Sequence, residues 1–268
     1  MRAAMNTGTD KMLAHVENGV GWMIYNNPAR HNAVSLEMQR AIPTILETFA
    51  ADPDVHVVVV SGAGEKAFVS GADISEFGEL RTSVDARREF DAVSTRAWEA
   101  WQRVEQPIVA MIEGFCIGGG LMTALQADIR VAAQGSVFGV PAARLGLGYP
   151  IDALEGLVAL VGPAWAAEMV FTARHLSADE ALRIGLVNRV VPVPQLAATV
   201  EELACSIAEN APMTVRAAKF ALAQLRRAPR DRDVARAREL VEACYRSEDY
   251  REGQRAFLEK RRPQFRGR

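Results

Sequence analysis

Residues 107–125 read PIVAMIEGFCIGGGLMTAL and combine three kinds of segment in a short space. The apolar run at 108–112 is typical of a strand that is buried on both faces. Glycines follow at 114 and at 118–120, and an apolar helix is expected from about Gly119 to Gln126. The stretch therefore predicts a buried strand, a turn where a ligand can approach the backbone closely, and a helix.

A second stretch has the same layout. Residues 57–77 read VVVVSGAGEKAFVSGADISEF, in which a valine run leads into small residues and then into an expected helix. Free N–H groups at the start of a helix attract negative charge, and two such groups aimed at one point would bind a carbonyl oxygen as an oxyanion hole. Glycine at a strand-to-helix turn is also ordinary turn geometry, so composition alone leaves both interpretations open.

The surrounding residues predict an α/β fold. Asn18-Gly19 favours a tight hairpin, because this pair accepts the left-handed conformations that such a turn requires. Ser35 is placed to cap a helix, and Ser177 with Glu180 forms a capping box for another. Further expected elements are strands at 56–60 and 128–133, a helix at 84–104, and helices beyond the proline-containing boundary at 191–194.

Composition limits the class of protein. The chain has 268 residues, of which 49% are hydrophobic and 24% are charged, as in ordinary globular proteins. Its formal net charge of −2 gives no general attraction to nucleic acid or to an anionic membrane, so we expect neither as a partner. Three cysteines without a CxxC pair argue against a disulfide framework and against a thiolate zinc site.

Several common motifs are absent from the sequence. It contains no GxxxxGK[ST] phosphate loop, no HExxH zinc motif and no GxSxG nucleophile motif. The N-terminus lacks the apolar core of a signal peptide, and the sequence contains no uninterrupted run of about eighteen apolar residues. We therefore expect a soluble, cytoplasmic protein with no metal site.

A series of longer motifs follows a fixed order along the chain. They are NNPARHNAVSLEM at 26–38, KAFVSGADISEF at 66–77, GFCIGGG at 114–120, RLGLGYP at 144–150 and REGQRAFLEKRRPQF at 251–265. The first is similar to the opening motif of the enoyl-CoA hydratase/isomerase family, the crotonase superfamily. The second and third resemble that family's two oxyanion segments, and the last two complete its order. The resemblance covers most of the chain.

The resemblance implies a fold and an assembly. It implies an α/β fold of the ClpP/crotonase type, a spiral of β-β-α turns with a C-terminal helical extension. Residues 1–10 would form a flexible tail, 11–195 the spiral core, and 196–268 a helical trimerisation region of a homotrimer or homohexamer. The implied substrate is an acyl-coenzyme A, and no separate cofactor is expected because coenzyme A enters as part of the substrate.

The resemblance also implies a set of binding residues. Ala72 and Gly119 would supply the two backbone N–H groups that hold the thioester oxygen while an enolate develops. The segment Ala72-Asp73-Ile74-Ser75 would line the acyl-CoA site, with Asp73 ordering the oxyanion turn. Arg30 could approach the CoA moiety. Lys260 is a candidate for a CoA phosphate, although a solvated lysine in a basic tail is an equally good interpretation.

Two positions depart from the pattern of the hydratases. Hydration of an enoyl double bond needs two carboxyl groups acting on one water. In the hydratases one glutamate lies three residues after the oxyanion glycine, where this chain has Met122. The second follows a proline, where this chain has Ala142 after Pro141. Neither a thioether nor a methyl group transfers protons, and both side chains are expected to line the pocket.

The loop after these positions contains the nearest acid/base candidates. Asp152 and Tyr149 occupy the region that borders the family's acyl pocket, and Glu155 lies one turn further on. Asp152 is expected to be the principal proton-transfer group if the protein is an enzyme. The alternative is structural, because Asp152-Ala153-Leu154-Glu155 is similar to a capping box, and Tyr149 could simply be a packing residue.

Two functions therefore remain open at the level of sequence. The first is an enzyme that works through a thioester enolate as an isomerase, decarboxylase, hydrolase or atypical lyase. The second is a non-catalytic acyl-CoA-binding protein on the same fold. RNA binding is disfavoured by the net charge of −2.

Overall fold

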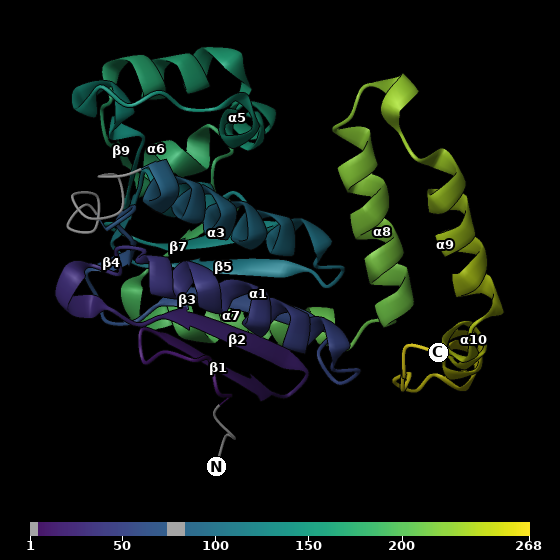
Figure 1. Ribbon diagram of the computed structural model, residues 1–268. Coiled ribbons are helices and arrows are strands. Elements are labelled where there is room, and N and C mark those ends of the chain that lie inside the picture. Colours follow the sequence, from purple (N-terminus) through teal and green to yellow (C-terminus); the bar gives the residue numbers. More distant parts are fainter. Residues whose placement is uncertain (1–4, 74–83) are drawn as a thin grey trace.

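Strands alternate between two sheets in the computed structural model, which describes residues 5–73 and 84–268 (Figure 1). The larger sheet has the order β1-β2-β3-β5-β7-β10 and the smaller one the order β4-β6-β8-β9. The bounds are β1 Met12–Glu17, β2 Val20–Tyr25, β3 Val57–Gly62, β4 Ala67–Val69, β5 Ile108–Ile112, β6 Phe115–Ile117, β7 Ile129–Ala133, β8 Val137–Gly139, β9 Leu176–Ser177 and β10 Arg189–Val191.

The helices follow pairs of strands. Along the chain β3 and β4 precede α3, β5 and β6 precede α4, and β7 and β8 precede α5, so the backbone winds as β-β-α turns. The helix bounds are α1 Leu36–Ala51, α3 Val84–Arg103, α4 Gly119–Ala124, α5 Ile151–Thr172, α6 Ala178–Arg183, α7 Leu196–Ala208, α8 Pro212–Leu225, α9 Val234–Arg246 and α10 Glu248–Glu259. The predicted α/β spiral is confirmed.

Local sequence determines several of these boundaries. Asn18 and Gly19 have φ angles of 52° and 78°, which is the left-handed geometry that a two-residue hairpin between β1 and β2 requires. The Ser35 side chain accepts a hydrogen bond from a backbone N–H in the first turn of α1. Ser177 and Glu180 form the predicted capping box of α6. Helix α4 is shorter than expected, because it ends at Ala124.

The valine run of β3 is buried between two helical layers. Val57 and Val59 belong to an apolar cluster with residues of α7, whereas Val58 and Val60 belong to the main core with residues of α1. Successive side chains of a strand point to opposite faces, so a strand covered on both faces must be apolar throughout. This is the reason why the run lacks polar alternation.

The N-terminal residues before β1 are tied to the hairpin where they are described. The backbone N–H of Met5 donates to the carbonyl oxygen of Ala14 at 2.9 Å, and the Thr7 hydroxyl donates to the carbonyl oxygen of Met12 at 2.8 Å. The segment that follows Tyr25 is held in the same way, because Asn26 N–H donates to the carbonyl oxygen of Lys11.

Helix α5 is long and apolar enough to cross a membrane by length and composition alone. It is not a straight helix, because Gly162 has φ 76° and ψ 164° and Pro163 follows it. Leu157 and Met169 on this helix are fully buried in the main core. Part of α5 therefore belongs to the folded core of the described chain.

Helices α8 and α9 run beside one another at one side of the core, and α10 closes their far end (Figure 1). Lys219 on α8 links this extension to the core, since its ammonium lies 3.0 Å from the carboxylate of Asp128 and donates to the carbonyl oxygen of Gln106 at 2.7 Å.

Candidate active site

The turn between β6 and α4 depends on two glycines. Gly118 has φ 56° and ψ −118°, a backbone conformation that is strained for other residues. A Cβ atom on Gly120 would lie 1.8 Å from the carbonyl oxygen of Val69 at the end of β4. Glycine at these positions lets the start of α4 pack directly against the backbone that follows β4.

The segment after β4 is held in an extended conformation by Val34. The Val34 N–H donates to the carbonyl oxygen of Gly71 at 2.8 Å, and the Asp73 N–H donates to the carbonyl oxygen of Val34 at 2.9 Å. Ala72 lies between these bonds and forms a parallel bridge with Val34. Because backbone groups alternate in direction along an extended segment, the N–H of Ala72 faces away from Val34.

The backbone segments that carry the N–H groups of Ala72 and Gly119 lie next to each other. A Cβ atom on Gly119 would lie 3.5 Å from the amide nitrogen of Ala72. Gly119 is the first residue of α4, where an N–H has no partner within the helix. Neither N–H donates a hydrogen bond to another described residue. Two uncommitted donors side by side can bind an oxygen atom on which negative charge develops.

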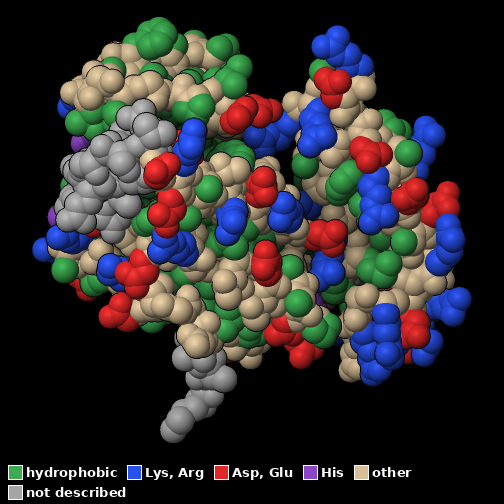
Figure 2. Space-filling model, in the orientation of Figure 1, with side chains coloured by type: hydrophobic (Ala, Val, Ile, Leu, Met, Phe, Trp, Pro, Cys, Tyr) green, Lys and Arg blue, Asp and Glu red, His purple; other side chains and the backbone are tan. Residues whose placement is uncertain are grey.

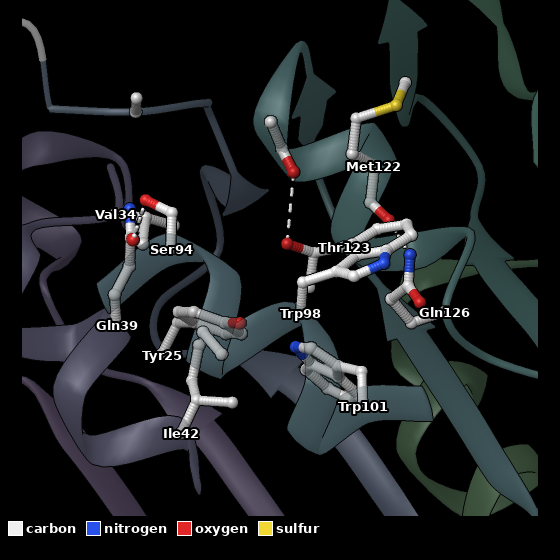
Figure 3. Close-up of a pocket in the computed structure, with 13 residues that line it drawn as sticks. Tyr25, Val34, Gln39, Ile42, Ser94, Trp98, Trp101, Met122, Thr123 and Gln126 are labelled. Atoms are coloured by element: carbon white, nitrogen blue, oxygen red, sulfur yellow. Dashed lines mark hydrogen bonds between the residues drawn. The ribbon is translucent and has the colours of Figure 1, made fainter. Parts of the chain in front are cut away.

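Both residues line a pocket of about 190 Å³ between α1, α3 and α4 (Figure 3). Its inner end is closed by Tyr25, which is fully buried, and by Trp101, which is 7% exposed. Trp98 is 37% exposed and lies at the mouth. The full set of lining residues is Tyr25, Val34, Gln39, Ile42, Ala72, Ser94, Ala97, Trp98, Trp101, Gly119, Met122, Thr123 and Gln126.

Most polar side chains in the pocket are bonded to protein groups. The Ser94 hydroxyl donates to the Gln39 side-chain oxygen at 2.7 Å and so links α3 to α1. The Thr123 hydroxyl donates to the carbonyl oxygen of Gly119 at 3.0 Å (Figure 3). The hydroxyl of Tyr25 has no hydrogen-bond partner among the described residues.

The predicted residues around Ala72 have separate roles. Asp73 is 8% exposed, and the Arg30 guanidinium donates to its two carboxylate oxygens at 3.2 Å and 3.4 Å. Arg30 therefore orders the segment that carries the Ala72 N–H. Its own side chain is 56% exposed beside this turn, which leaves it accessible to a ligand. Ile74 and Ser75 lie outside the described residues.

The two positions that replace the hydratase glutamates differ in location. Met122 lines the pocket from α4, three residues after Gly119, as the sequence predicted. Ala142 lies in the 3-10 helix Pro141–Leu145, is 4% exposed and packs in the main core. It is not among the residues that line the pocket, so the structure places Met122 beside Gly119 but not Ala142.

Tyr149 lies near the turn that precedes Gly119. Its hydroxyl would lie 3.7 Å from a Cβ atom on Gly118. Burial raises the pKa of this phenol above its ordinary value, so the group stays protonated at neutral pH. Tyr149 therefore presents a neutral hydroxyl next to the oxyanion turn.

Asp152 lies on the first turn of α5, with an exposed side chain. It lines a second cavity of about 420 Å³, which shares Trp98, Trp101 and Gln126 with the first pocket but includes neither Ala72 nor Gly119. Glu155 lines the same second cavity. The capping-box interpretation of these two acids is wrong. Pro150 occupies the N-cap, and no side chain caps this helix.

Lys260 ends α10 with a left-handed φ of 54° and is exposed. In this chain α10 lies at the end of the helical extension, away from α3, which carries the pocket tryptophans (Figure 1). Lys260 does not line the pocket.

Sequence reasoning missed several pocket residues. Trp98 and Trp101 fall in the helix predicted at 84–104, and Tyr25 follows the predicted hairpin, but no sequence pattern assigned these residues to a pocket. A fully buried tyrosine at the end of an otherwise apolar strand is a usable signal, because its hydroxyl needs a partner. Which cavity it faces depends on contacts with α1, α3 and α4 that are distant in sequence.

Comparisons with known proteins identify the family. Residues 15–268 match the sequence model of the enoyl-CoA hydratase/isomerase family. A short-chain-enoyl-CoA hydratase of Clostridium acetobutylicum is 34% identical over 253 residues, which are 94% of this chain and 96% of that protein.

Solved structures give the same assignment. An enoyl-CoA hydratase/carnithine racemase from Magnetospirillum magneticum is 36% identical, with a TM-score of 0.89 and coverage of 97% of both chains. An enoyl-CoA hydratase from Bacillus anthracis is 30% identical, with a TM-score of 0.87 and coverage of 97% of this chain and 100% of that one. The fold is that of the crotonase superfamily, and the chain belongs to the enoyl-CoA hydratase/isomerase family.

Proposed function

We propose that the protein is an enzyme that binds an acyl-CoA thioester and stabilises its enolate in an oxyanion hole formed by the N–H groups of Ala72 and Gly119. The observation that carries this proposal is the approach of the two amide segments beside one pocket, with neither N–H bonded to a described residue. The names of the similar hydratases support the substrate class.

The two donors would act on the thioester oxygen. Loss of a proton or of carbon dioxide from the α-carbon leaves the bonding electron pair behind and moves negative charge onto that oxygen, and fixed N–H donors bind the charged form more strongly than the neutral carbonyl. One such donor typically contributes about 10²–10³ in rate. The site thus favours reactions in which an enolate forms.

The reaction class follows from what the pocket lacks. Among the residues that line the described pocket there is no carboxylate, and Met122 stands at the position of a hydratase glutamate. We therefore propose isomerase, decarboxylase, hydrolase or atypical lyase chemistry rather than hydration by two carboxyl groups.

The proton-transfer group is proposed to be Tyr149 or Asp152. Tyr149 is supported by its position, because its hydroxyl would lie 3.7 Å from a Cβ atom on Gly118, and by burial, which raises its pKa and keeps the phenol protonated at neutral pH. Asp152 lines the second cavity, which shares Trp98 and Trp101 with the pocket. It would reach a substrate in the pocket only if these two tryptophan side chains moved.

Residues outside the pocket would bind the CoA moiety. Arg30 is supported by its position at the oxyanion turn and by its exposed guanidinium, which can pair with a phosphate. Lys260 would contribute to a phosphate site only if α10, or a copy of α10 from another chain, approaches the pocket. Coenzyme A would be part of the substrate, so no separate cofactor is proposed.

A second candidate function is non-catalytic binding of acyl-CoA. One observation favours it. The thioether of Met122 lines the pocket at the position where the hydratases have a proton-transferring glutamate. Such a protein would keep the oxyanion donors and the acyl pocket but would not turn its ligand over.

A panel of acyl-CoA thioesters separates these functions. The panel should include saturated, enoyl, malonyl-type and hydroxyacyl thioesters, with binding measured by calorimetry and turnover by chromatography. Conversion of at least one thioester supports the enzyme, whereas saturable binding without conversion supports the binding protein. If no thioester binds, both proposals are wrong.

We also propose assembly into a homotrimer or homohexamer. Apolar side chains gather over α5 and along the C-terminal helices (Figure 2). Phe171 on α5 is 79% exposed, and Phe257 and Leu258 on α10 are 84% and 80% exposed. A second copy of the chain would cover these surfaces, which are costly to leave in water. Light scattering after size-exclusion chromatography should give a mass of three or six chains, and a monomer would contradict the proposal.

A further inference from the structure

The hydroxyl of Tyr25 is buried and faces the acyl pocket. Tyr25 has no solvent exposure, and its hydroxyl has no hydrogen-bond partner among the described residues. The ring is held by an edge-on contact with Phe68, with centroids 6.4 Å apart and planes at 61°. An unpaired buried hydroxyl is unfavourable, so this group is a donor available to whatever fills the pocket.

Thr123 is the protein group beside this hydroxyl. Its side chain interacts with the Tyr25 hydroxyl and so lowers the Tyr25 pKa, against the larger rise that burial causes. The two hydroxyl groups do not meet the geometry of a hydrogen bond, and Thr123 donates its own proton to the carbonyl oxygen of Gly119. The Tyr25 hydroxyl can therefore donate a hydrogen bond to a ligand, and burial keeps this hydroxyl protonated.

Tyr25 marks the inner end of the pocket. Ile42 and Trp101 beside it are 3% and 7% exposed, whereas Trp98 at the mouth is 37% exposed. An acyl group whose thioester lies at Ala72 and Gly119 would point its distal carbons inward. A cavity of about 150 Å³ holds a benzene ring, so about 190 Å³ suits an acyl group of about six carbons.

We propose that the Tyr25 hydroxyl donates a hydrogen bond to an oxygen atom on the distal part of the acyl group. The pocket then prefers short acyl-CoA thioesters that carry a hydroxyl or keto oxygen to unsubstituted thioesters of the same length. The inference rests on the proposed function, because it assumes that the acyl group occupies this pocket. Tyr25 is a specificity-determining residue in this account, and Trp101 and Ile42 provide the apolar walls around it.

The test compares ligands that differ by one oxygen. The ligands are hexanoyl-CoA and its derivatives with a hydroxyl on the fourth, fifth or sixth carbon of the acyl chain. Each ligand is titrated calorimetrically into three proteins, which are the wild type, Tyr25→Phe and Tyr245→Phe. Tyr245 lies on α9 and is 62% exposed, so its variant removes a hydroxyl outside the pocket. In the wild type at least one hydroxylated thioester should bind roughly three- to tenfold more tightly than hexanoyl-CoA.

The Tyr25→Phe variant should lose this preference. Its affinities for the hydroxylated and unsubstituted thioesters should become equal within about twofold, while Tyr245→Phe keeps the wild-type ratio. Its Tm without ligand should equal or exceed that of the wild type, because only an unpaired hydroxyl is removed. A clearly lower Tm would show that the hydroxyl is bonded within the protein and would overturn the inference.

Other outcomes separate this inference from the proposed function. If hexanoyl-CoA binds but no hydroxylated thioester binds more tightly, the proposed substrate class stands and the role of Tyr25 is wrong. The role is also wrong if Tyr25→Phe keeps the preference. If none of the thioesters binds to the wild type, the proposed function fails and the inference fails with it.

Discussion

A Cβ atom on Gly120 would lie 1.8 Å from the carbonyl oxygen of Val69, so the first turn of α4 and the end of β4 are packed backbone against backbone. This contact determines how far Gly119 stands from the segment that carries Ala72. The proposed oxyanion hole thus depends on a residue that itself touches no substrate.

Gly120→Ala should destabilise the protein, because the clash is with the backbone rather than with a flexible side chain. We expect a loss of about 3 kcal/mol in the free energy of unfolding and a loss of any turnover. Urea unfolding measures the first quantity. Gly119→Ala is the matched control, because a Cβ there meets its nearest neighbour at 3.5 Å, an ordinary contact. Equal stability of the two variants would contradict the packing described here.

Crotonyl-CoA should not be hydrated at a rate typical of enzymes. Met122 lines the pocket where a hydratase glutamate would lie, and no carboxylate is among the described lining residues. The absorbance of the conjugated thioester follows the reaction directly. The similar hydratase of Clostridium acetobutylicum serves as the positive control in the same buffer. Hydration at about 10 s⁻¹ or more by this chain would disprove the expectation.

Tyr149→Phe and Asp152→Asn test the two proton-transfer candidates. Once a substrate is known, loss of the true group should lower turnover about 10²–10⁴-fold. We expect the larger loss for Tyr149→Phe, because that hydroxyl lies near the oxyanion turn, 3.7 Å from where a Cβ atom on Gly118 would be. Asp152→Asn should leave Tm unchanged, because this side chain caps no helix. A large loss of turnover confined to Asp152→Asn would reverse the assignment.

Glu180 should make stability depend on pH. The Ser177 N–H and the Arg174 guanidinium lower its pKa from 4.5 to about 2. The pKa of Glu180 is lower in the folded protein than the ordinary value of 4.5 that applies to the unfolded chain. The ionised carboxylate therefore stabilises the folded state fully above pH 4.5, and this stabilisation is lost as the pH falls towards 2. The difference in Tm between wild type and Glu180→Gln should therefore shrink between about pH 6 and pH 3. A constant difference would show that the ionised carboxylate does not contribute.

Features that depend on nearby residues could be predicted from the sequence. The hairpin at Asn18-Gly19, the Ser35 cap and the capping box of Ser177 with Glu180 each need only a few consecutive residues. The assignment of Ala72 and Gly119 came from the family resemblance, since composition alone left ordinary turns as an alternative.

Features that depend on distant contacts could not be predicted. The inner end of the pocket joins Tyr25 on β2 to Trp101 on α3 and Thr123 on α4, and no local pattern encodes that meeting. The capping interpretation of Asp152 failed for a local reason. Pro150 already has the extended geometry of an N-cap, with φ −69° and ψ 155°, so α5 starts at Ile151 and Asp152 falls inside its first turn.

The central claim, that the Gly119 N–H stabilises a charged thioester oxygen, is tested most directly by comparing Gly119→Pro with Gly119→Ala. Proline removes the N–H, and it is tolerated at the first position of a helix, which Gly119 occupies in α4. Alanine keeps the N–H and adds a Cβ in ordinary contact. With Tm values that show both variants to be folded, turnover of the best thioester should be about 10²–10³-fold lower in Gly119→Pro than in Gly119→Ala, because both variants carry the Cβ and only proline lacks the N–H. Equal turnover in the two variants would contradict the account.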